Sequence, residues 1–569
     1  MDARRLRDTL TKERTIPFTQ KATSVLHSLS HGDKVIFWML AGLMGLGAIF
    51  ALGELRDQIV EVVPAHGGSL TEGVVGSPRF VNPLLALSDT DRDLVELTFA
   101  GLMGVDKEGN LIPELAESYT LSEDGLTYTF IIKESATFHD GEPVTAEDVA
   151  FTVSKLQDPL IKSPKIANWL GVQTEVLDIR SVSFTLTEPY APFLENATLG
   201  IIPKHIWKDV PSEEFPFSQF VVEPIGAGPY KVTNVQRNNS GILKEYNLRA
   251  FDEYALGKPY INNISLKFYG NESSLQKALA RGEIESAHSL IPENLPKDLK
   301  VVTGPYLRVF GVFLNQNENE VLSSIVVRKA LSTSLDRQKI IDTVLSGYGT
   351  PLTSPLPGIP ATTVENPIEE AIDVLERNGW EFSVENRVWE KKNDSIRITL
   401  RTSNIPELAQ TAQIIKQSFE AIGVPTNLEL YDTGELSQGV IRPRNYQGLL
   451  FGMVLGRVPD LYAFWHSSQR NDPGLNVALY ANVDADDALE HLRETHDAEE
   501  REEHLEEFLD EVDADIPAIF THAPQMTYLI PQNLNGVSLP PLTTASDRFS
   551  NVHTWYRETE KVWPFLVRD

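Results

Sequence analysis

The side chains that most often carry out chemistry are scattered along this chain and form no catalytic motif. The sequence contains no G-x-S-x-G, H-E-x-x-H, G-x-x-x-x-G-K-S/T or G-x-G-x-x-G pattern. It contains no cysteine, which excludes disulfides, thiolate metal ligands and cysteine nucleophiles. No serine lies in a local pattern that would activate it as a nucleophile. We therefore predict that the protein is not an enzyme and holds no cofactor.

Two short groups of residues come closest to a chemical site. Gly226 and Gly228 in PIGAGPYK lack the third glycine of a phosphate-binding loop, and we expect a turn there. His491, His496 and His504 follow one another closely in the sequence. Their spacing does not place them on one helical face, as an i, i+4 pair of metal ligands would be. Neither group predicts a metal site.

Composition limits the partners of the protein. The formal net charge of −30 argues against binding to nucleic acid and against close adhesion to anionic lipid headgroups. Hydrophobic residues make up 41% of the chain, which is enough to build a packed core. Single cores stop growing near ~250–300 residues, so a chain of 569 residues favours two or three lobes. We expect a monomer.

The segment Val35 to Gly53 is the strongest topological signal. Its nineteen residues carry no charge, and roughly 20 apolar residues are needed to cross the hydrocarbon core as a helix. The preceding segment is basic, and short basic flanks stay on the cytoplasmic side of a membrane. Its basic residues are Arg4, Arg5, Arg7, Lys12, Arg14, Lys21 and Lys34. We therefore predict a single-pass cell-membrane protein with a cytoplasmic N-terminus and an extracytoplasmic main domain.

A cleaved signal peptide is the alternative for the same segment. Ala51 and Gly53 offer a small-x-small pattern of the kind that precedes a cleavage site. The basic segment before the apolar run is long for a signal peptide, and the run exceeds the usual ~7 to 15 residues. An uncleaved anchor is the favoured interpretation.

Several segments of the main domain have clear local patterns. The alternation of Tyr128, Phe130 and Ile132 with polar neighbours predicts a half-buried strand. Thr145 and Asp148 resemble a capping box at the start of a helix. GGSLTEGVVG, beginning at Gly67, predicts a first strand between glycines.

The second half of the chain predicts a β-α-β unit. Asn366 and Pro367 begin one helix, which Asn378 and Gly379 end. We predict a strand at 396–400 and another at 427–431. Between them Leu408, Ala412, Ile415, Phe419 and Ile422 share one helical face that Gly423 ends. Such units build α/β lobes. The acidic run 499–513 predicts a helix with a solvated face.

Several stretches together resemble one protein family. The stretch Gly101 to Thr152, GLMGVDKEGNLIPELAESYTLSEDGLTYTFIIKESATFHDGEPVTAEDVAFT, resembles the signature region of the extracellular solute-binding proteins of ABC transporters, family 5, the peptide and nickel binding group. The resemblance continues from about residue 70 to 565. It is carried by PIGAGPYKV (224–232), ALARGEIESA (278–287), VRKALSTSLDRQKIIDTVLSGYGTP (327–351), AIDVLERNGW (371–380), LRTSN (400–404) and SSQRNDPGLNVALYAN (467–482).

The resemblance implies an α/β fold of the two-lobed periplasmic-binding-protein-like type, with a hinge and an inserted subdomain. In this chain the transmembrane helix predicted from the apolar run precedes it. The ligand would be enclosed between the lobes when they close. Carried onto this chain, the division is a cytoplasmic tail (1–34), an anchor (35–53), a spacer (54–66), lobe one (67–109, 224–311 and 521–569), the inserted subdomain of lobe one (110–223) and lobe two (312–520).

The resemblance also implies where a ligand would bind. Relatives that take peptides hold the peptide backbone by strand-like hydrogen bonds, and the matching protein strands are Leu87, Ser88 and Asp89 in lobe one and Met453, Val454, Leu455, Gly456 and Arg457 in lobe two. Trp169, Tyr306, Arg308, Phe310, Tyr462 and Trp465 are candidate pocket walls. For each aromatic residue, packing in the core is an equal alternative.

Arg457 departs from the family pattern. Peptide-binding relatives usually carry an aspartate there, which holds the α-ammonium group of the peptide, and a guanidinium would repel that group. We hypothesise that no free peptide N-terminus is anchored at this point. Arg457 could instead face a ligand carboxylate or phosphate, or Asp460 could supply the acidic partner. Alternatively, Arg457 points to solvent or pairs with Asp460.

The function that the resemblance implies is capture of oligopeptides, or a related small solute, and delivery to the permease subunits of an ABC importer. A chelated metal entering as a small anionic complex belongs to the same group of ligands, and Arg308 and Arg457 would suit one. The alternative is a ligand-binding sensor or scaffold without transport, because a membrane helix and a cytoplasmic tail replace the usual lipid anchor.

Overall fold

The computed structural model describes residues 29–291, 296–359, 361 and 365–563, without the side chains of residues 48–59. The chain divides into two compact units, which are described separately. The first comprises residues 1–65 with 559–569, and the second comprises residues 66–558. The predicted tail, residues 1–34, lies outside the described residues except for its last six positions.

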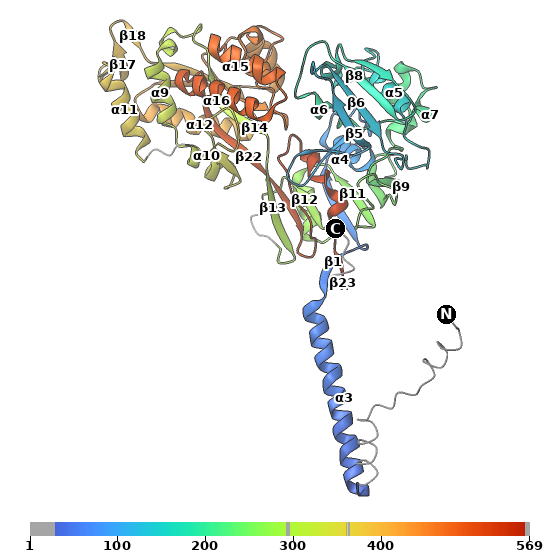
Figure 1. Cartoon of the computed structure of the whole chain (residues 1–569). Helices are drawn as coiled ribbons and strands as arrows, with labels where there is room; N and C mark the ends of the chain where they lie inside the picture. Colours follow the sequence, from blue (N-terminus) through green and yellow to red (C-terminus); the bar gives the residue numbers. More distant parts are fainter. Residues whose placement is uncertain (1–28, 292–295, 360, 362–364, 564–569) are drawn as a thin grey trace, which may run out of the picture. The chain divides into compact units, whose positions relative to one another are not determined.

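The first unit contains one long helix and a small sheet (Figure 1). Helix α3 (His31–Ile59) begins where the hydroxyl of Ser30 accepts a hydrogen bond from the Asp33 amide. The predicted span 35–53 falls within α3, although the side chains of its last six residues are outside the described part. Within the described residues, no helix reaches the combination of length and hydropathy that a membrane span requires.

The segment predicted as a spacer, 54–66, contains the end of α3 and strand β1. Helix α3 continues to Ile59, and strand β1 (Glu61–Ala65) pairs with β23 (Glu558–Val562). No proline lies between Glu54 and Ile59 to break the helix.

The second unit is organised around one long strand, β22 (Ala518–Pro531), which belongs to both halves of a large mixed sheet (Figure 1). On one side of β22 the strand order is β12-β2-β11-β10-β9, and this side is the first half of the sheet. On the other side the order is β14-β21-β19-β20, and this side is the second half. Strands β13 and β15 also pair with β22. The strands of the first half are β2 (Ser69–Val75), β9 (Tyr230–Arg237), β10 (Leu243–Ala250), β11 (Asn263–Tyr269), β12 (Ser286–His288) and β13 (Leu299–Pro305). Those of the second half are β14 (Arg308–Leu314), β15 (Gly349–Pro351), β19 (Ile398–Ser403), β20 (Thr426–Tyr431) and β21 (Gly448–Val454).

Between β2 and β9 the chain builds a separate antiparallel sheet, called here the inserted subdomain. Its order is β5-β6-β8-β7, and helix α5 packs against β7 and β8. These elements are β5 (Ala116–Leu121), β6 (Thr127–Ile132), β7 (Gln173–Val176), β8 (Ser181–Thr185), α5 (Ala146–Leu156), α6 (Phe193–Asn196) and α7 (Lys204–Trp207). One hydrophobic cluster, which includes Phe130, Val149 and Phe184, forms its core.

The remaining helices lie around the two halves of the large sheet. They are α4 (Asp89–Thr98), α8 (Glu272–Ala280), α9 (Ile325–Thr333), α10 (Arg337–Val344), α11 (Pro367–Arg377), α12 (Pro406–Ala421), α13 (Thr433–Glu435), α14 (Tyr462–Trp465), α15 (Val483–Glu494), α16 (Ala498–Asp515) and the 3-10 turns η7 (Ala545–Phe549) and η8 (Val552–Thr554). Short strands complete the fold at β3 (Met103–Val105), β4 (Leu111–Pro113), β16 (Glu381–Ser383), β17 (Val388–Lys391) and β18 (Asp394–Ser395).

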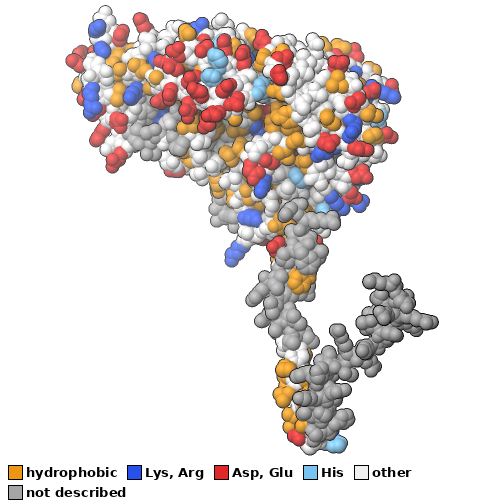
Figure 2. Space-filling model, viewed as in Figure 1, with side chains coloured by type: hydrophobic (Ala, Val, Ile, Leu, Met, Phe, Trp, Pro, Cys, Tyr) orange, Lys and Arg blue, Asp and Glu red, His pale blue; other side chains and the backbone are white. Residues whose placement is uncertain are grey.

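The local sequence patterns predicted these elements correctly. The amide and hydroxyl groups of Thr145 both donate to the carboxylate of Asp148 at the start of α5. In α12 the side chains of Ala412, Ile415 and Phe419 are buried, and β19 pairs in parallel with β20, as a β-α-β unit requires. The acidic run forms α16, and Asp and Glu side chains gather over the face that carries it (Figure 2).

Candidate ligand-binding site

A cavity of about 530 Å³ lies between the two halves of the large sheet and the inserted subdomain. Ligand pockets commonly measure ~300–1,000 Å³, so a small solute would fit. Helix α4 and η7 contribute lining residues from the first half, α6 from the inserted subdomain, and the segment after β21 from the second half. A molecule bound here would therefore contact all three parts.

The segment after β21 reaches the cavity because it approaches α6 closely. Gly456 lines the cavity, and a Cβ atom at this position would lie 2.6 Å from the carboxylate of Glu195. A larger residue here would require the Glu195 side chain to move. The backbone amides of Arg457 and Val458 then donate to the two oxygens of Glu195 at 3.1 and 3.3 Å. These bonds fix the position of the segment against the inserted subdomain.

The guanidinium of Arg457 lies between two carboxylates. Its Nη2 donates to Oδ2 of Asp547 at 2.7 Å, and its Nη1 is 3.6 Å from Oε1 of Glu195. The Arg457 side chain is 11% exposed and that of Asp547 is 12% exposed. Within the described part of the chain, the buried Nε of Arg457 has no hydrogen-bond partner. The charge of Arg457 is thus neutralised by the protein.

Asp547 is held rigidly by the turn that carries it. Its Oδ2 accepts hydrogen bonds from the amide and hydroxyl of Thr543 and from the amide of Thr544, and its Oδ1 accepts from the Thr544 hydroxyl. This carboxylate caps η7 in the way that a capping box does.

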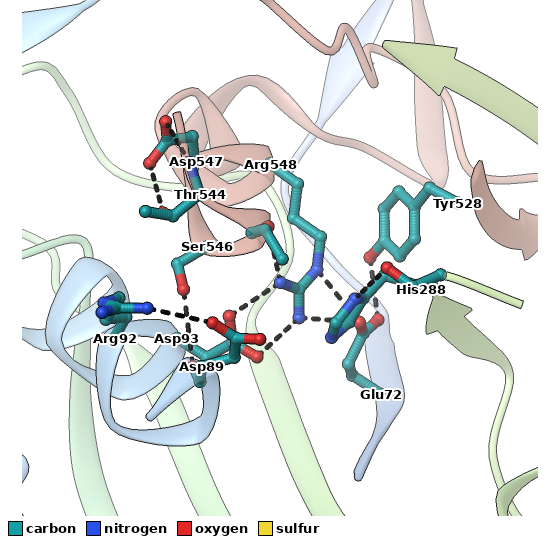
Figure 3. A network of polar contacts seen from close by, with 12 residues as sticks. Glu72, Asp89, Arg92, Asp93, His288, Tyr528, Thr544, Ser546, Asp547 and Arg548 are labelled. Carbon is teal, nitrogen blue, oxygen red and sulfur yellow. Dashed lines mark hydrogen bonds and ion pairs between the residues drawn. The ribbon is translucent and has the colours of Figure 1, made fainter. Parts of the chain in front are cut away.

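The next residue, Arg548, anchors η7 to the first half. Its guanidinium is fully buried and forms a bidentate ion pair with Asp93 of α4, at 2.7 and 2.8 Å. It also donates to Oε1 of Glu72 in β2 at 3.0 and 3.2 Å (Figure 3). The hydroxyl of Tyr528 donates to the other oxygen of Glu72 at 2.8 Å. The network therefore ties η7, α4, β2 and β22 together beside the cavity.

Asp460 takes part in a second contact between the second half and the inserted subdomain. It accepts a hydrogen bond from the Tyr190 hydroxyl at 3.1 Å and pairs with Arg493 at 3.3 Å. The guanidinium of Arg493 also lies over the rings of Tyr190 and Tyr462, at 5.0 and 4.5 Å from their centroids.

The cavity wall also carries two carboxyl groups with raised pKa values. Burial, together with the nearby carboxylates of Asp547 and Glu114, raises the pKa of Glu96 to about 8. Burial raises the pKa of Glu114 to about 7, although Glu114 accepts a hydrogen bond from the Tyr254 hydroxyl at 2.6 Å. A site of this kind favours a neutral carboxyl group or a cationic neighbour.

The residues proposed from the family resemblance divide into two groups in the structure. Those that line the cavity are Trp169, Val454, Leu455, Gly456, Arg457 and Asp460. Those outside its lining are Leu87, Ser88, Asp89, Tyr306, Arg308, Met453 and Trp465. Trp465 is fully buried in the core of the second half, and Phe310 stacks on His522 with ring centroids 4.9 Å apart. Tyr306 is covered by the guanidinium of Arg308 at 4.3 Å.

Two details of the sequence-based interpretation need correction. Leu87 to Asp89 is not a strand, because Ser88 is the N-cap of α4 and its hydroxyl accepts a hydrogen bond from the Asp91 amide. Arg457 neither points to solvent nor pairs with Asp460, because Asp547 and Glu195 are its partners and Asp460 pairs with Arg493.

Glu195 and Asp547 were not predicted as site residues. Their contacts with the Arg457 segment join positions 262 and 90 residues apart in the chain. No local spacing pattern relates such positions. Gly456 was the nearest available signal, since a glycine inside a predicted site often marks a close approach of backbone to another group.

Comparison with known proteins defines the class of protein to which this fold and cavity belong. The model of the bacterial extracellular solute-binding proteins, family 5, matches residues 110–474, and the chain belongs to this family. The oligopeptide-binding protein AppA of Bacillus subtilis is 28% identical over 499 residues, which cover 84% of this chain and 90% of AppA.

Solved structures share the fold. The structure of AppA from Bacillus subtilis in complex with a nonapeptide matches with a TM-score of 0.63 and 26% identity, covering 87% of this chain and 100% of that one. The substrate-binding protein CtaP of Listeria monocytogenes matches with a TM-score of 0.71 and 27% identity. The match covers 86% of this chain and 99% of that one. NikZ of Campylobacter jejuni, solved in complex with Ni(L-His), matches with a TM-score of 0.65 and 24% identity, covering 86% of this chain and 99% of that one. A likeness at this identity shows the fold alone. The chain therefore has the α/β two-lobed periplasmic-binding-protein-like fold of an extracytoplasmic solute-binding protein.

Proposed function

We propose that this protein is a membrane-anchored solute-binding protein that captures an oligopeptide, or a related small solute, and delivers it to an ABC importer. The observation that carries the proposal is the cavity of about 530 Å³, which residues of the first half, the second half and the inserted subdomain enclose together. A solute bound there stabilises the closed arrangement through contacts with every part.

The proposed lobes follow the two halves of the large sheet. Lobe one would comprise residues 67–109, 224–311 and 521–569 with the inserted subdomain 110–223, and lobe two would comprise residues 312–520. In support, β22 passes from one half to the other near position 523, where its partner changes from β13 to β14. The β13–β14 connection lies beside it, and we propose these two segments as the hinge.

The proposed binding surface is the cavity wall. The sequence-derived candidates on it are Trp169, Val454, Leu455, Gly456, Arg457 and Asp460. Val454 is 53% exposed and ends β21, where it pairs with Arg308 of β14 on one side, and we propose its other side for strand-like pairing with an extended ligand. The curated relative AppA is named for binding oligopeptides, which supports an extended peptide as the first ligand to test.

The segment Val35 to Gly53 is the proposed membrane anchor. Its uncharged run supports this role, as does the basic segment before it. An anchor would keep the binding domain close to a permease and raise its effective concentration there. N-terminal sequencing of the mature protein tests the proposal, and a start near Glu54 would show that the segment is a cleaved signal.

Native mass spectrometry of the full chain in detergent tests ligand capture directly. We expect an added mass that corresponds to a peptide or a small solute, and its fragmentation identifies the class. If the protein is empty, a thermal-shift screen of di- to nonapeptides should raise the apparent melting temperature through ligand binding. Failure of every peptide and of metal complexes such as nickel–histidine would contradict the proposal.

Crosslinking in native membranes distinguishes import from sensing. Recovery of transporter permease subunits supports delivery. Recovery of kinase-like partners in their place would favour a sensor, for which the helix and the N-terminal segment of the chain would provide the connection across the membrane.

A further inference from the structure

The contact between Arg457, Glu195 and Asp547 joins three separately packed parts of the molecule. Arg457 follows β21 in the second half, Glu195 lies in α6 of the inserted subdomain, and Asp547 lies in η7 on the first half. Asp547 is oriented within its own part of the molecule by the Thr543–Thr544 turn. Glu195 is oriented across the contact, by the backbone amides of Arg457 and Val458.

Two oriented carboxylates at a cavity wall form a subsite for a cation. A guanidinium suits such a site because it is planar, permanently charged and able to donate to two carboxylates at once. In this protein the cation comes from the chain itself, since Nη2 of Arg457 is 2.7 Å from Asp547 and its side chain is 89% shielded from solvent.

We propose that Arg457 is a built-in cation that fills the acidic subsite of Glu195 and Asp547 and clasps the two lobes together without a ligand. The ammonium group of a peptide is then not required at this subsite, and ligand selection falls to the rest of the cavity. The inference rests on the two-lobed binding mode proposed above, but it concerns the empty protein and does not depend on the identity of the solute.

Other contacts also join the inserted subdomain to the second half, and they limit how far loss of Arg457 can open the protein. The Tyr128 hydroxyl bonds to Nε2 of His496 at 2.7 Å, and the amide of Ala191 donates to the carbonyl of Arg493 at 3.0 Å. Removal of Arg457 should therefore weaken closure without abolishing it. Hydrogen bonds to charged groups are strong enough that the ratio of closed to open molecules should fall by about tenfold.

Distance measurement between two spin labels tests the proposal in the full chain. The protein has no cysteine, so Ser154→Cys in α5 and Glu506→Cys in α16 provide two unique labelling sites, both exposed. Native mass spectrometry first establishes that no solute is bound. We expect the empty wild type to give mainly one short distance, and the Arg457→Ala variant to gain a population at longer distance.

Three further measurements separate the clasp from a general loss of stability. Millimolar methylguanidinium should restore the short distance in Arg457→Ala, whereas tetramethylammonium, which cannot donate hydrogen bonds, should not. Glu195→Gln should also open the protein, because it removes one of the two charges. Arg377→Ala is the matched control, since Arg377 is 78% exposed and pairs with Asp373 of its own helix, and we expect no change.

Salt provides a test that needs no variant at position 457. Raising the ionic strength should populate the long distance in the doubly labelled wild type, since salt weakens charge pairs that are not fully buried. The proposal is overturned if the empty wild type is already open, if its distances do not respond to salt, or if Arg457→Ala matches Arg377→Ala. A closed empty protein that later proves to bind no solute would refute the proposed function and leave the clasp intact.

Discussion

The buried ion pairs of Arg548 allow a quantitative prediction about stability. In the Arg548→Met variant, an unbranched apolar side chain that ends about where Nε of arginine lies replaces the guanidinium side chain and cannot pair with a carboxylate. Glu72 and Asp93, whose side chains are both 0% exposed, would then lose their cationic partner (Figure 3). Breaking a buried ion pair from one side costs about 3–5 kcal/mol, because the remaining charge stays buried.

Burial raises the pKa of Glu72 even beside Arg548, so Asp93 is the main charge left unpaired, and we expect a loss within that range, about 4 kcal/mol in the free energy of unfolding at pH 8. The loss should shrink as the pH falls. Arg548 holds the pKa of Asp93 below its ordinary value against the opposing effect of burial, so wild-type stability from this group is lost as the pH falls through the folded pKa. In the variant both carboxyl groups can instead take up protons and become neutral.

Urea unfolding of the full chain, followed by tryptophan fluorescence at pH 5 and pH 8, measures the effect. Arg377→Met is the control, and its exposed pair should change the free energy of unfolding by less than about 0.5 kcal/mol. The triple variant Arg548→Met, Glu72→Gln, Asp93→Asn should recover much of the loss, because no buried charge remains unpaired. A loss below about 1 kcal/mol, or an equal loss at both pH values, would refute the reasoning.

Two further predictions concern the cavity wall and the family motif. The pKa of Glu114 is about 7, above the unfolded value of about 4.3, so the folded state loses stability as the pH rises through this window. Glu114→Gln should remove a pH-dependent loss of about 3 kcal/mol while retaining a partner for Tyr254, and unfolding curves from pH 5 to pH 8 should become flatter. A Cβ at Gly226 would lie 2.0 Å from the carbonyl oxygen of Thr98, so Gly226→Ala should cost about 1–3 kcal/mol in urea unfolding. Gly270→Ala, where a Cβ meets no atom within 4 Å, is its control, and an equal effect of the two substitutions would disprove the steric argument.

Local patterns predicted the elements of this fold well because their causes are local. The start of α5 depends on Thr145 and Asp148, which are three residues apart. The buried face of α12 follows from the spacing of Ala412, Ile415 and Phe419. Such contacts are present in any helix with this sequence, whatever surrounds it.

The site was less predictable because tertiary contacts build it. The sequence indicated that Arg457 is unusual, and its segment does line the cavity. It could not indicate the partners of Arg457, because Glu195 comes from the inserted subdomain and Asp547 from a turn near the end of the unit. Trp465 shows the converse limit, since its family position suggested a pocket wall but surrounding apolar side chains enclose it completely.

The path of β22 constrains how the two halves can move. At the crossing point β22 and the β13–β14 connection run side by side, and the amide of Tyr306 donates to the carbonyl of Pro524 at 3.1 Å. If the two halves rotate as proposed, both segments would have to bend together at this point. Each closing movement would return the residues of one half to the same neighbours on the other. The β13–β14 connection also reaches the cavity wall, because the amide of Leu455, which lines the cavity, donates to the carbonyl of Leu307 at 2.8 Å.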